Sequence, residues 1–296
     1  MADSPIPFKV VATDLDGTLL NPCHSVSEYT RRVINALINK GVPVVFATGR
    51  HHGDVLETKR KLGLKGYTIT SNGARVHDPQ NRVILEKNIE SSIARELALL
   101  AINEEDIVTS IYRKDSWLVN KDATALAEYF KANKDVFCYQ LFNPVEEKDY
   151  DEVYKVYFTS DRRASLDALS DKIAATYGDK VSITMSLPNC LEVMKKGVNK
   201  GAALREVVSR ILGNGDENAG GVATTEAAST IKHCIAFGDG LNDVEMLNMA
   251  EKGCLMENAQ KELLSVAPSH LEIIGRNSED GVAKYLANLF KLNVDA

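Results

Sequence analysis

The string DLDGT at residues 14–18 constrains the fold more than any other part of this sequence. It follows an apolar run, residues 8–13, that is typical of a short buried strand, and its glycine indicates where the strand ends. Asp14 and Asp16 therefore lie where a strand passes into a loop, the edge at which open α/β sheets bind ligands. Because two carboxylates this close repel each other, the pair favours a site that holds a cation or a proton.

A solvated turn or a calcium loop would also explain an isolated Asp-x-Asp-Gly. An EF-hand loop needs glycine at its sixth position and glutamate at its twelfth. This chain has Leu19 and Ser25 at those positions, so the EF-hand is excluded. The solvated turn remains the alternative for the motif taken alone.

The same arrangement recurs along the chain. The apolar runs at residues 43–47 and 234–237 end in ATGR and FGDGLND, and Asn199 is suited to cap a helix that begins with Lys200. An earlier helix, with Ser25 and Glu28 as a capping box, separates the first two strands. Strands that alternate with helices in this way predict a Rossmann-like, doubly wound parallel sheet, an α/β fold.

Parallel strands end at the same edge of a sheet, so the polar residues that follow them should meet. We expect four carboxylates, a hydroxyl and an ammonium group to converge there: Asp14, Asp16, Asp239, Asp243, Thr48 and Lys200. A divalent cation together with one phosphoryl group would balance these charges. Hard oxygen ligands favour Mg²⁺ over softer metals.

Residues 85–194 follow a different pattern. Turn residues at 78–81 predict a hairpin, and several strand-like segments with helices near 93–101, 125–130 and 166–175 follow it. This pattern predicts an α+β cap domain inserted into the core. The expected division is a core of residues 1–84 and 195–296 around a cap of residues 85–194, with a glycine-rich surface loop at 213–230.

Composition limits the classes of partner. The chain has 296 residues, 44% of them hydrophobic, and a net charge of −6, which argues against a nucleic-acid polymer as partner. The five cysteines are scattered, which is typical of free thiols in a reducing compartment. Neither a secretory signal nor an apolar stretch of about 18 residues is present, so we expect a cytoplasmic protein without membrane partners.

Seven strings together resemble the haloacid dehalogenase superfamily of phosphatases, specifically the Cof-type hydrolases with a large α/β cap: DLDGTLL, FATGR, SNGA, GVNKGAAL, FGDGLNDVEML, MENA and NSEDGVA. The resemblance covers almost the whole chain. It implies a mobile cap and Mg²⁺-dependent hydrolysis of a small phosphorylated metabolite, most often a sugar phosphate. The protein would act as a monomer or a homodimer.

The resemblance also implies roles for individual residues. Asp14 corresponds to the nucleophile that forms an aspartyl phosphate, and Asp16 to the general acid and base. Thr48 and Lys200 would stabilise the phosphoryl group. The metal ligands would be Asp14, Asp239 and the backbone carbonyl of Asp16, and Asp243 would belong to the metal site through a metal-bound water or would orient Lys200. The substrate-binding residues would be Gly49, Arg50, Asn72 and Asn242.

Two other functions fit the same residues: a sugar phosphomutase of the same fold, and a non-catalytic protein that binds phosphorylated metabolites. The cap is expected to set specificity because it closes over the catalytic edge. Residues in or beside the cap that could face its pocket are Arg113, Lys114, Trp117, Lys155, Asn189 and Lys195, although for each of them an exposed or core position is the stronger expectation. His51 and His52 are expected at a solvated helix start.

Overall fold

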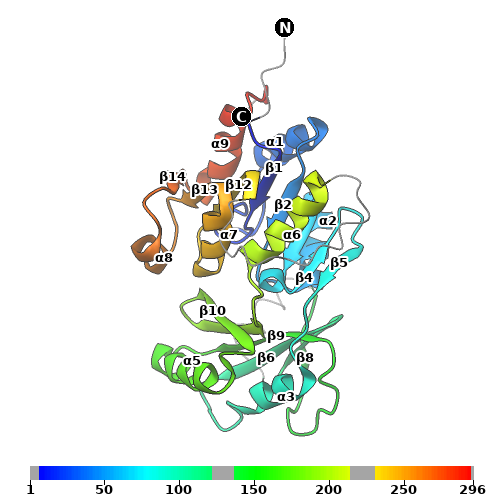
Figure 1. The fold of residues 1–296 in the computed structure, drawn as a ribbon, viewed down its shortest axis with the longest axis vertical. Coiled ribbons are helices and arrows are strands. Elements are labelled where there is room, and N and C mark those ends of the chain that lie inside the picture. Colours follow the sequence, from blue (N-terminus) through cyan, green and yellow to red (C-terminus); the bar gives the residue numbers. More distant parts are fainter. Residues whose placement is uncertain (1–6, 122–136, 214–230, 295–296) are drawn as a thin grey trace.

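The computed structural model describes residues 7–121, 137–213 and 231–294. Its strands form an eight-stranded sheet and a six-stranded sheet, each with its own helices (Figure 1). The chain leaves the larger sheet after β5 (Val83–Glu86) and returns to it after β11 (Cys190–Lys195). The predicted architecture, a core interrupted by a cap, is therefore confirmed. The helix predicted at 125–130 and nearly all of the predicted 213–230 loop fall outside the described residues.

The core sheet has the strand order β14-β13-β12-β1-β2-β3-β4-β5. Its strands from β14 to β3 pair in parallel, and β4 and β5 form the predicted antiparallel hairpin. The central strands are buried on both faces, which explains their continuous apolar runs. The strands before β5 and after the cap are β1 (Val10–Thr13), β2 (Val44–Ala47), β3 (Tyr67–Thr70), β4 (Arg75–His77), β12 (Ile231–Gly238), β13 (Ala250–Met256) and β14 (Glu272–Ile274).

Helices cover both faces of the core sheet. Val33 of α1 and Leu286 of α9 belong to the apolar cluster on one face, and Leu204 of α6 and Met246 of α7 belong to the cluster on the other. The helical segments of the core are α1 (Glu28–Asn39), α2 (His52–Leu62), η1 (Ser71–Gly73), α6 (Lys200–Leu212), η2 (Leu241–Asp243), α7 (Val244–Met249), α8 (Lys261–Val266), η3 (Asn277–Glu279) and α9 (Gly281–Leu289). Every helix in the described ranges is too short or too polar to cross a lipid bilayer.

The N-terminal cap of α1 differs from the predicted capping box. The Ser27 side chain, not that of Ser25, accepts the hydrogen bond from the Thr30 amide, at 2.9 Å. Ser25 instead donates its own amide to the Asn21 side chain. Both serines precede the apolar helical face, so the spacing of hydrophobic residues could not decide between them.

The cap sheet has the strand order β10-β11-β9-β6-β7-β8 and is antiparallel except for the pair of β7 and β8. Helices α3 (Ser91–Leu99) and α5 (Arg163–Tyr177) pack on one face around a cluster that includes Leu97, Val156 and Val193. The remaining strands are β6 (Val108–Arg113), β7 (Ser116–Val119), β8 (Gln140–Leu141), β9 (Val153–Thr159) and β10 (Val181–Leu187).

The other face of the cap sheet meets the core. The guanidinium of Arg75 lies 4.1 Å from the centre of the Tyr154 ring. The ring of His51 stacks on Phe137 with centroids 4.2 Å apart and meets Tyr112 edge-on at 5.0 Å. Aromatic side chains of the cap thus pack directly against Arg75 and His51 of the core.

The prediction that His51 and His52 lie at a solvated helix start is therefore wrong for His51, which is 2% exposed. His51 does begin α2, because its Nδ1 accepts the Gly53 amide at 2.9 Å. The docked cap shields His51 from water, and no local sequence pattern predicts this burial. His52 is partly buried and stacks on His77 of β4 with ring centroids 3.3 Å apart.

These buried imidazoles predict a loss of stability in acid. Burial, followed by the charges of His52 and Arg75, lowers the pKa of His77 to about 3. The unfolded chain takes up this proton near pH 6.5, so the folded state loses about 2 kcal/mol through this group between pH 7 and 5. Between pH 7 and 5, we expect the free energy of unfolding of the native chain to fall by about 2 kcal/mol more than that of His77→Gln. Urea titrations at the two pH values measure this difference.

The same substitution at His270, which is exposed, provides the control. Equal pH dependence of the native chain and His77→Gln would contradict the burial of a neutral imidazole at this position.

Candidate active site

The end of β1 brings Asp14 to the carboxyl edge of the core sheet. Its amide donates to the carbonyl of Phe237 at 2.9 Å, which ties the loop to the end of β12. Gly17 allows the next turn because its φ is +80° and a Cβ there would lie 2.3 Å from Asp239 Oδ2. The glycine that ends the strand in the sequence therefore also lets the loop approach Asp239.

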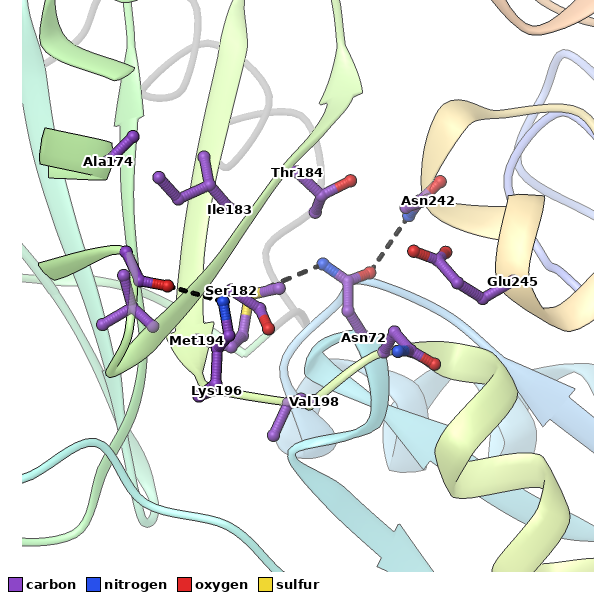
Figure 2. A pocket seen from close by; sticks show the side chains of 13 residues that line it. Asn72, Ala174, Ser182, Ile183, Thr184, Met194, Lys196, Val198, Asn242 and Glu245 are labelled. Atoms are coloured by element: carbon purple, nitrogen blue, oxygen red, sulfur yellow. Dashed lines mark hydrogen bonds between the residues drawn. The ribbon is translucent and has the colours of Figure 1, made fainter. Parts of the chain in front are cut away.

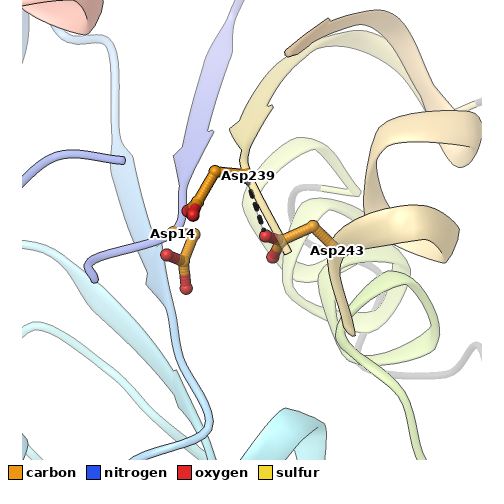
Figure 3. A group of neighbouring side chains, drawn as sticks. All are labelled: Asp14, Asp239 and Asp243. Carbon is orange, nitrogen blue, oxygen red and sulfur yellow. Dashed lines mark hydrogen bonds between the residues drawn. The ribbon is translucent and has the colours of Figure 1, made fainter. Parts of the chain in front are cut away.

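Three carboxylates form one cluster at this edge: Asp14, Asp239 and Asp243 (Figure 3). Each offers an oxygen atom within 4.8 Å of the others. The loop after β12 is closed on itself, because Asp243 Oδ2 accepts the amides of Asp239 at 3.0 Å and Gly240 at 2.9 Å. Thr18 donates to Asp239 Oδ1 at 2.6 Å and fixes that side chain.

Lys200 is the cation of this cluster and is 0% exposed. Its Nζ donates to Asp14 at 2.6 Å and to Asp243 at 2.7 Å. The side chain enters from the first turn of α6, where Asn199 accepts the Ala202 amide as the predicted cap. Burial alone would lower the pKa of Lys200, but the two carboxylates outweigh it and the pKa is raised. The ammonium therefore stays charged.

One ammonium does not neutralise three carboxylates. Burial, opposed by Lys200 and reinforced by the neighbouring aspartates, raises the pKa of Asp14 well above its usual range. Burial and the charge of Asp243 raise the pKa of Asp239 to about 7. A hard divalent cation relieves this repulsion, and carboxylate oxygens are its preferred ligands. The donor set therefore fits Mg²⁺.

The Asp16 side chain has different partners from the cluster. Arg50 Nε donates to Asp16 Oδ2 at 2.6 Å, a second contact joins Arg50 Nη2 to Oδ1, and His24 Nδ1 lies 3.3 Å from Oδ1. Burial acts to raise the pKa of Asp16, but the His24 hydrogen bond and the Arg50 charge outweigh it and hold the pKa well below its usual range. Arg50, expected to bind substrate, thus pairs with Asp16 and also contacts Asp54 at 3.1 Å.

The remaining predicted residues line the same edge. Thr48 is buried, and its Oγ1 accepts the Arg50 amide at 3.2 Å. Asn242 Nδ2 donates to Asn72 Oδ1 at 3.0 Å, and a Cβ on Gly49 would lie 3.1 Å from that same oxygen. The structure therefore brings every predicted site residue to one place, with the Asp16 carboxylate turned to Arg50.

A cleft of about 360 Å³ opens at this edge and is lined by residues of both the core and the cap. Of the six cap candidates, Lys155 alone is among its described lining residues. The cap side chains that sequence reasoning missed are Tyr112, Tyr157, Ser186, Leu187, Cys190 and Glu192. A signal existed for Glu192, because it is a single acidic residue inside the otherwise apolar segment 190–194.

Known proteins share these features over nearly the whole chain. The sequence profile of the haloacid dehalogenase-like hydrolases matches residues 11–219 and 224–286. A Buchnera aphidicola (subsp. Schizaphis graminum) protein named "Putative phosphatase" is 37% identical over 97% of both chains. The HMP-PP phosphatase of Cronobacter sakazakii is 35% identical over 94% of both chains.

Solved structures agree with this likeness. A haloacid dehalogenase-like hydrolase from B. subtilis superimposes with a TM-score of 0.76 and 25% identity, covering 95% of this chain and 99% of that one. The family profile spans the catalytic edge as well as the cap. The chain therefore belongs to the haloacid dehalogenase superfamily, among its Cof-type hydrolases, and is a phosphoric monoester hydrolase.

Proposed function

We propose that this phosphatase depends on Mg²⁺ and hydrolyses small phosphomonoesters, most readily sugar phosphates, through an aspartyl phosphate on Asp14. The observation that supports this most is the meeting of Asp14, Asp239 and Asp243 with the buried Lys200 at the end of the parallel strands. Phosphoryl transfer depends on positioning and charge stabilisation, which such a group supplies.

In the proposed reaction, a carboxylate oxygen of Asp14 attacks phosphorus and the bond to the leaving oxygen breaks. Asp16 gives that oxygen a proton. Asp16 then removes a proton from a water molecule, which attacks phosphorus and frees inorganic phosphate and Asp14. Lys200 holds Asp14 in place through its 2.6 Å contact, and Thr48 donates to a phosphoryl oxygen.

The Mg²⁺ ligands would be the carboxylates of Asp14, Asp239 and Asp243 and the backbone carbonyl of Asp16. When bound, the ion supplies positive charge that neutralises the carboxylates and the phosphoryl oxygens. Thr18 and the amides of residues 239 and 240 already hold two of these carboxylates, so the ligands are oriented in advance.

The proposed role of Asp16 sets a condition on Arg50. A general acid must carry a proton, whereas the contacts with Arg50 keep the pKa of Asp16 low. Arg50 therefore has to release Asp16 before the leaving group is protonated. A bound phosphoryl group is a suitable alternative partner for the guanidinium, which matches the substrate-binding role proposed for Arg50 and, beside it, Gly49.

A screen of phosphorylated metabolites with Mg²⁺ tests the substrate class. It should include sugar phosphates, nucleotides and HMP-PP, since one relative is named for acting on HMP-PP. With a hexose 1-phosphate, release of free phosphate indicates a phosphatase, and formation of an isomeric sugar phosphate indicates a phosphomutase. A chain that binds but turns over none of these esters would contradict the proposed function.

We also propose that residues 85–194 form the cap domain between the two core parts, 1–84 and 195–296. The acidic balance and scattered cysteines support a cytoplasmic setting, with a small phosphorylated metabolite as partner. Asn72 and Asn242, hydrogen-bonded to each other, are proposed to face that metabolite.

A further inference from the structure

Two charged side chains are buried on the face of the cap that meets the core. Lys155 lies on β9 and Glu192 on β11, and each side chain is 3% exposed. Lys155 Nζ donates to Glu192 Oε1. Each is the charged residue within a largely apolar run of its strand. The next residue along each strand, Val156 or Val193, packs into the apolar cluster on the opposite face of the cap sheet.

The pair also binds the core on both sides. Lys155 Nζ donates to the backbone carbonyl of Gly49 at 2.8 Å, and Asn72 Nδ2 donates to Glu192 Oε2 at 2.7 Å. Asn72 in turn accepts from Asn242 at 3.0 Å. A continuous chain of buried polar contacts thus joins two cap strands to the loops that carry Thr48, Asp239 and Asp243.

Figure 2 shows the last of these polar contacts, the hydrogen bond between Asn72 and Asn242. The two residues line a neighbouring cavity of about 350 Å³ at the boundary of cap and core. Asn242 lines both this cavity and the catalytic cleft. The backbone of Asn72 adds a further link, since its amide donates to the carbonyl of Thr48 at 3.0 Å.

Stability does not explain a buried ion pair at this place. Removing two charges from water costs more than their attraction usually returns, and apolar side chains of similar volume stabilise a fold at least as well. The cap already has an apolar cluster on its other face. What an apolar pair could not provide is the hydrogen bonds to Gly49 and Asn72.

We propose that Lys155 and Glu192 are positioning residues of the phosphatase reaction. They dock the cap onto the carbonyl of Gly49 and the side chain of Asn72, and so hold Thr48 and Asn242 in place beside the catalytic carboxylates. This role rests on the proposed function only in requiring that the chain hydrolyses phosphate esters.

The rival role, in which Lys155 binds the phosphoryl group itself, conflicts with its surroundings. Its Nζ already contacts Glu192 and Gly49 and lies 5.0 Å from the ring centres of both Tyr112 and Tyr157. Direct binding would make the loss of Lys155 more harmful than the loss of Glu192. Positioning by the pair makes the two losses similar and non-additive.

The test compares Lys155→Met, Glu192→Gln and the double variant in steady-state hydrolysis of p-nitrophenyl phosphate. We expect each to lower kcat by about 10²-fold with a smaller change in KM, because small displacements of positioned groups have effects of this size. The double variant leaves no uncompensated buried charge, so it remains informative if a single variant fails to fold. The decrease in kcat of the double variant should match that of either single variant. A nearly unchanged kcat in the double variant, or losses that multiply, would overturn the proposal.

Val156→Ala is the matched control, because Val156 is on the same strand but packs into the other face of the cap. It should lower the melting temperature and leave kcat nearly unchanged. If it lowers kcat as much as Lys155→Met does, cap stability explains the effect and the positioning role is wrong.

Tryptophan emission gives a readout that does not depend on turnover. Trp117 is the single tryptophan of the chain and meets Tyr112 edge-on with centroids 5.7 Å apart. Addition of inorganic phosphate with Mg²⁺ should change its emission in the native chain and in Val156→Ala, but not in the double variant. A native chain that does not hydrolyse p-nitrophenyl phosphate would contradict the proposed function alone. A double variant whose emission changes as much as that of the native chain would contradict the positioning role.

Discussion

Asp14→Asn is expected to lower Mg²⁺-dependent hydrolysis of p-nitrophenyl phosphate by about 10⁴-fold or more, as removal of a covalent nucleophile does in other enzymes. The amide nitrogen and oxygen occupy the same space, so the contact of this side chain with Lys200, now at 2.6 Å, can persist. What is lost is the anionic oxygen that attacks phosphorus. The measurement is kcat from initial rates of nitrophenol release.

Asp14 is also a proposed metal ligand, so the two roles must be separated. Weaker metal binding would be overcome by raising the Mg²⁺ concentration, whereas a missing nucleophile would not. Turnover that returns to the native rate at high Mg²⁺ would therefore contradict the nucleophile assignment.

A stability measurement excludes misfolding as the cause. Burial and neighbouring aspartates raise the pKa of Asp14, so its ionised form destabilises the metal-free fold at neutral pH. Neutral asparagine removes this cost. We expect the melting temperature of Asp14→Asn in EDTA to equal or exceed that of the native chain, as is common when a strained functional group is replaced.

The core of the fold could be predicted because its strands are buried on both faces. Residues 10–13, 44–47 and 234–237 read as continuous apolar runs, and each is followed by a polar motif. Parallel pairing then brings those motifs to one edge without any knowledge of side-chain contacts. The cluster of Asp14, Asp239 and Asp243 has the geometry that this reasoning expects.

The partners of individual side chains could not be predicted in the same way. Asp16 is two residues from Asp14, yet its carboxylate pairs with Arg50, which is 34 residues away. That choice depends on the direction in which each side chain leaves its loop. Similarly, the burial of His51 depends on contact with Tyr112, which lies more than fifty positions later in the sequence, and charge and periodicity near His51 do not predict this contact.

The contact between Lys155 and Glu192 on the cap face could be predicted only with knowledge of the strand register. Glu192 pairs directly with Tyr157 on the neighbouring strand, which places it diagonal to Lys155. A shift of β11 by one residue would turn Glu192 into the apolar cluster beneath α3 and α5, so the contact with Lys155 forms only in the correct register. The sequence shows that each charge is unusual in its strand but not that the two meet.

Removal of Mg²⁺ should abolish activity, and this loss should be reversible. EDTA leaves Asp14, Asp239 and Asp243 with Lys200 as their cation, a set in which burial and the charge of Asp243 raise the pKa of Asp239 to about 7. Restored Mg²⁺ should return activity and raise the melting temperature. At a Mg²⁺ concentration about 100 times the dissociation constant, binding to the folded state adds about 2.7 kcal/mol to its free energy of unfolding.

Asp239→Asn tests whether this stabilisation arises at the predicted cluster. The variant keeps a side-chain oxygen that can accept from Thr18, now at 2.6 Å, but lacks the charge that attracts the ion. We expect it to lose both the activity and most of the Mg²⁺-dependent rise in melting temperature. Asp171→Asn, an exposed position on α5, removes the same charge far from the site and should retain both. If Asp239→Asn responds to Mg²⁺ as strongly as Asp171→Asn does, the ion binds elsewhere, and the convergence of carboxylates at the sheet edge does not explain catalysis.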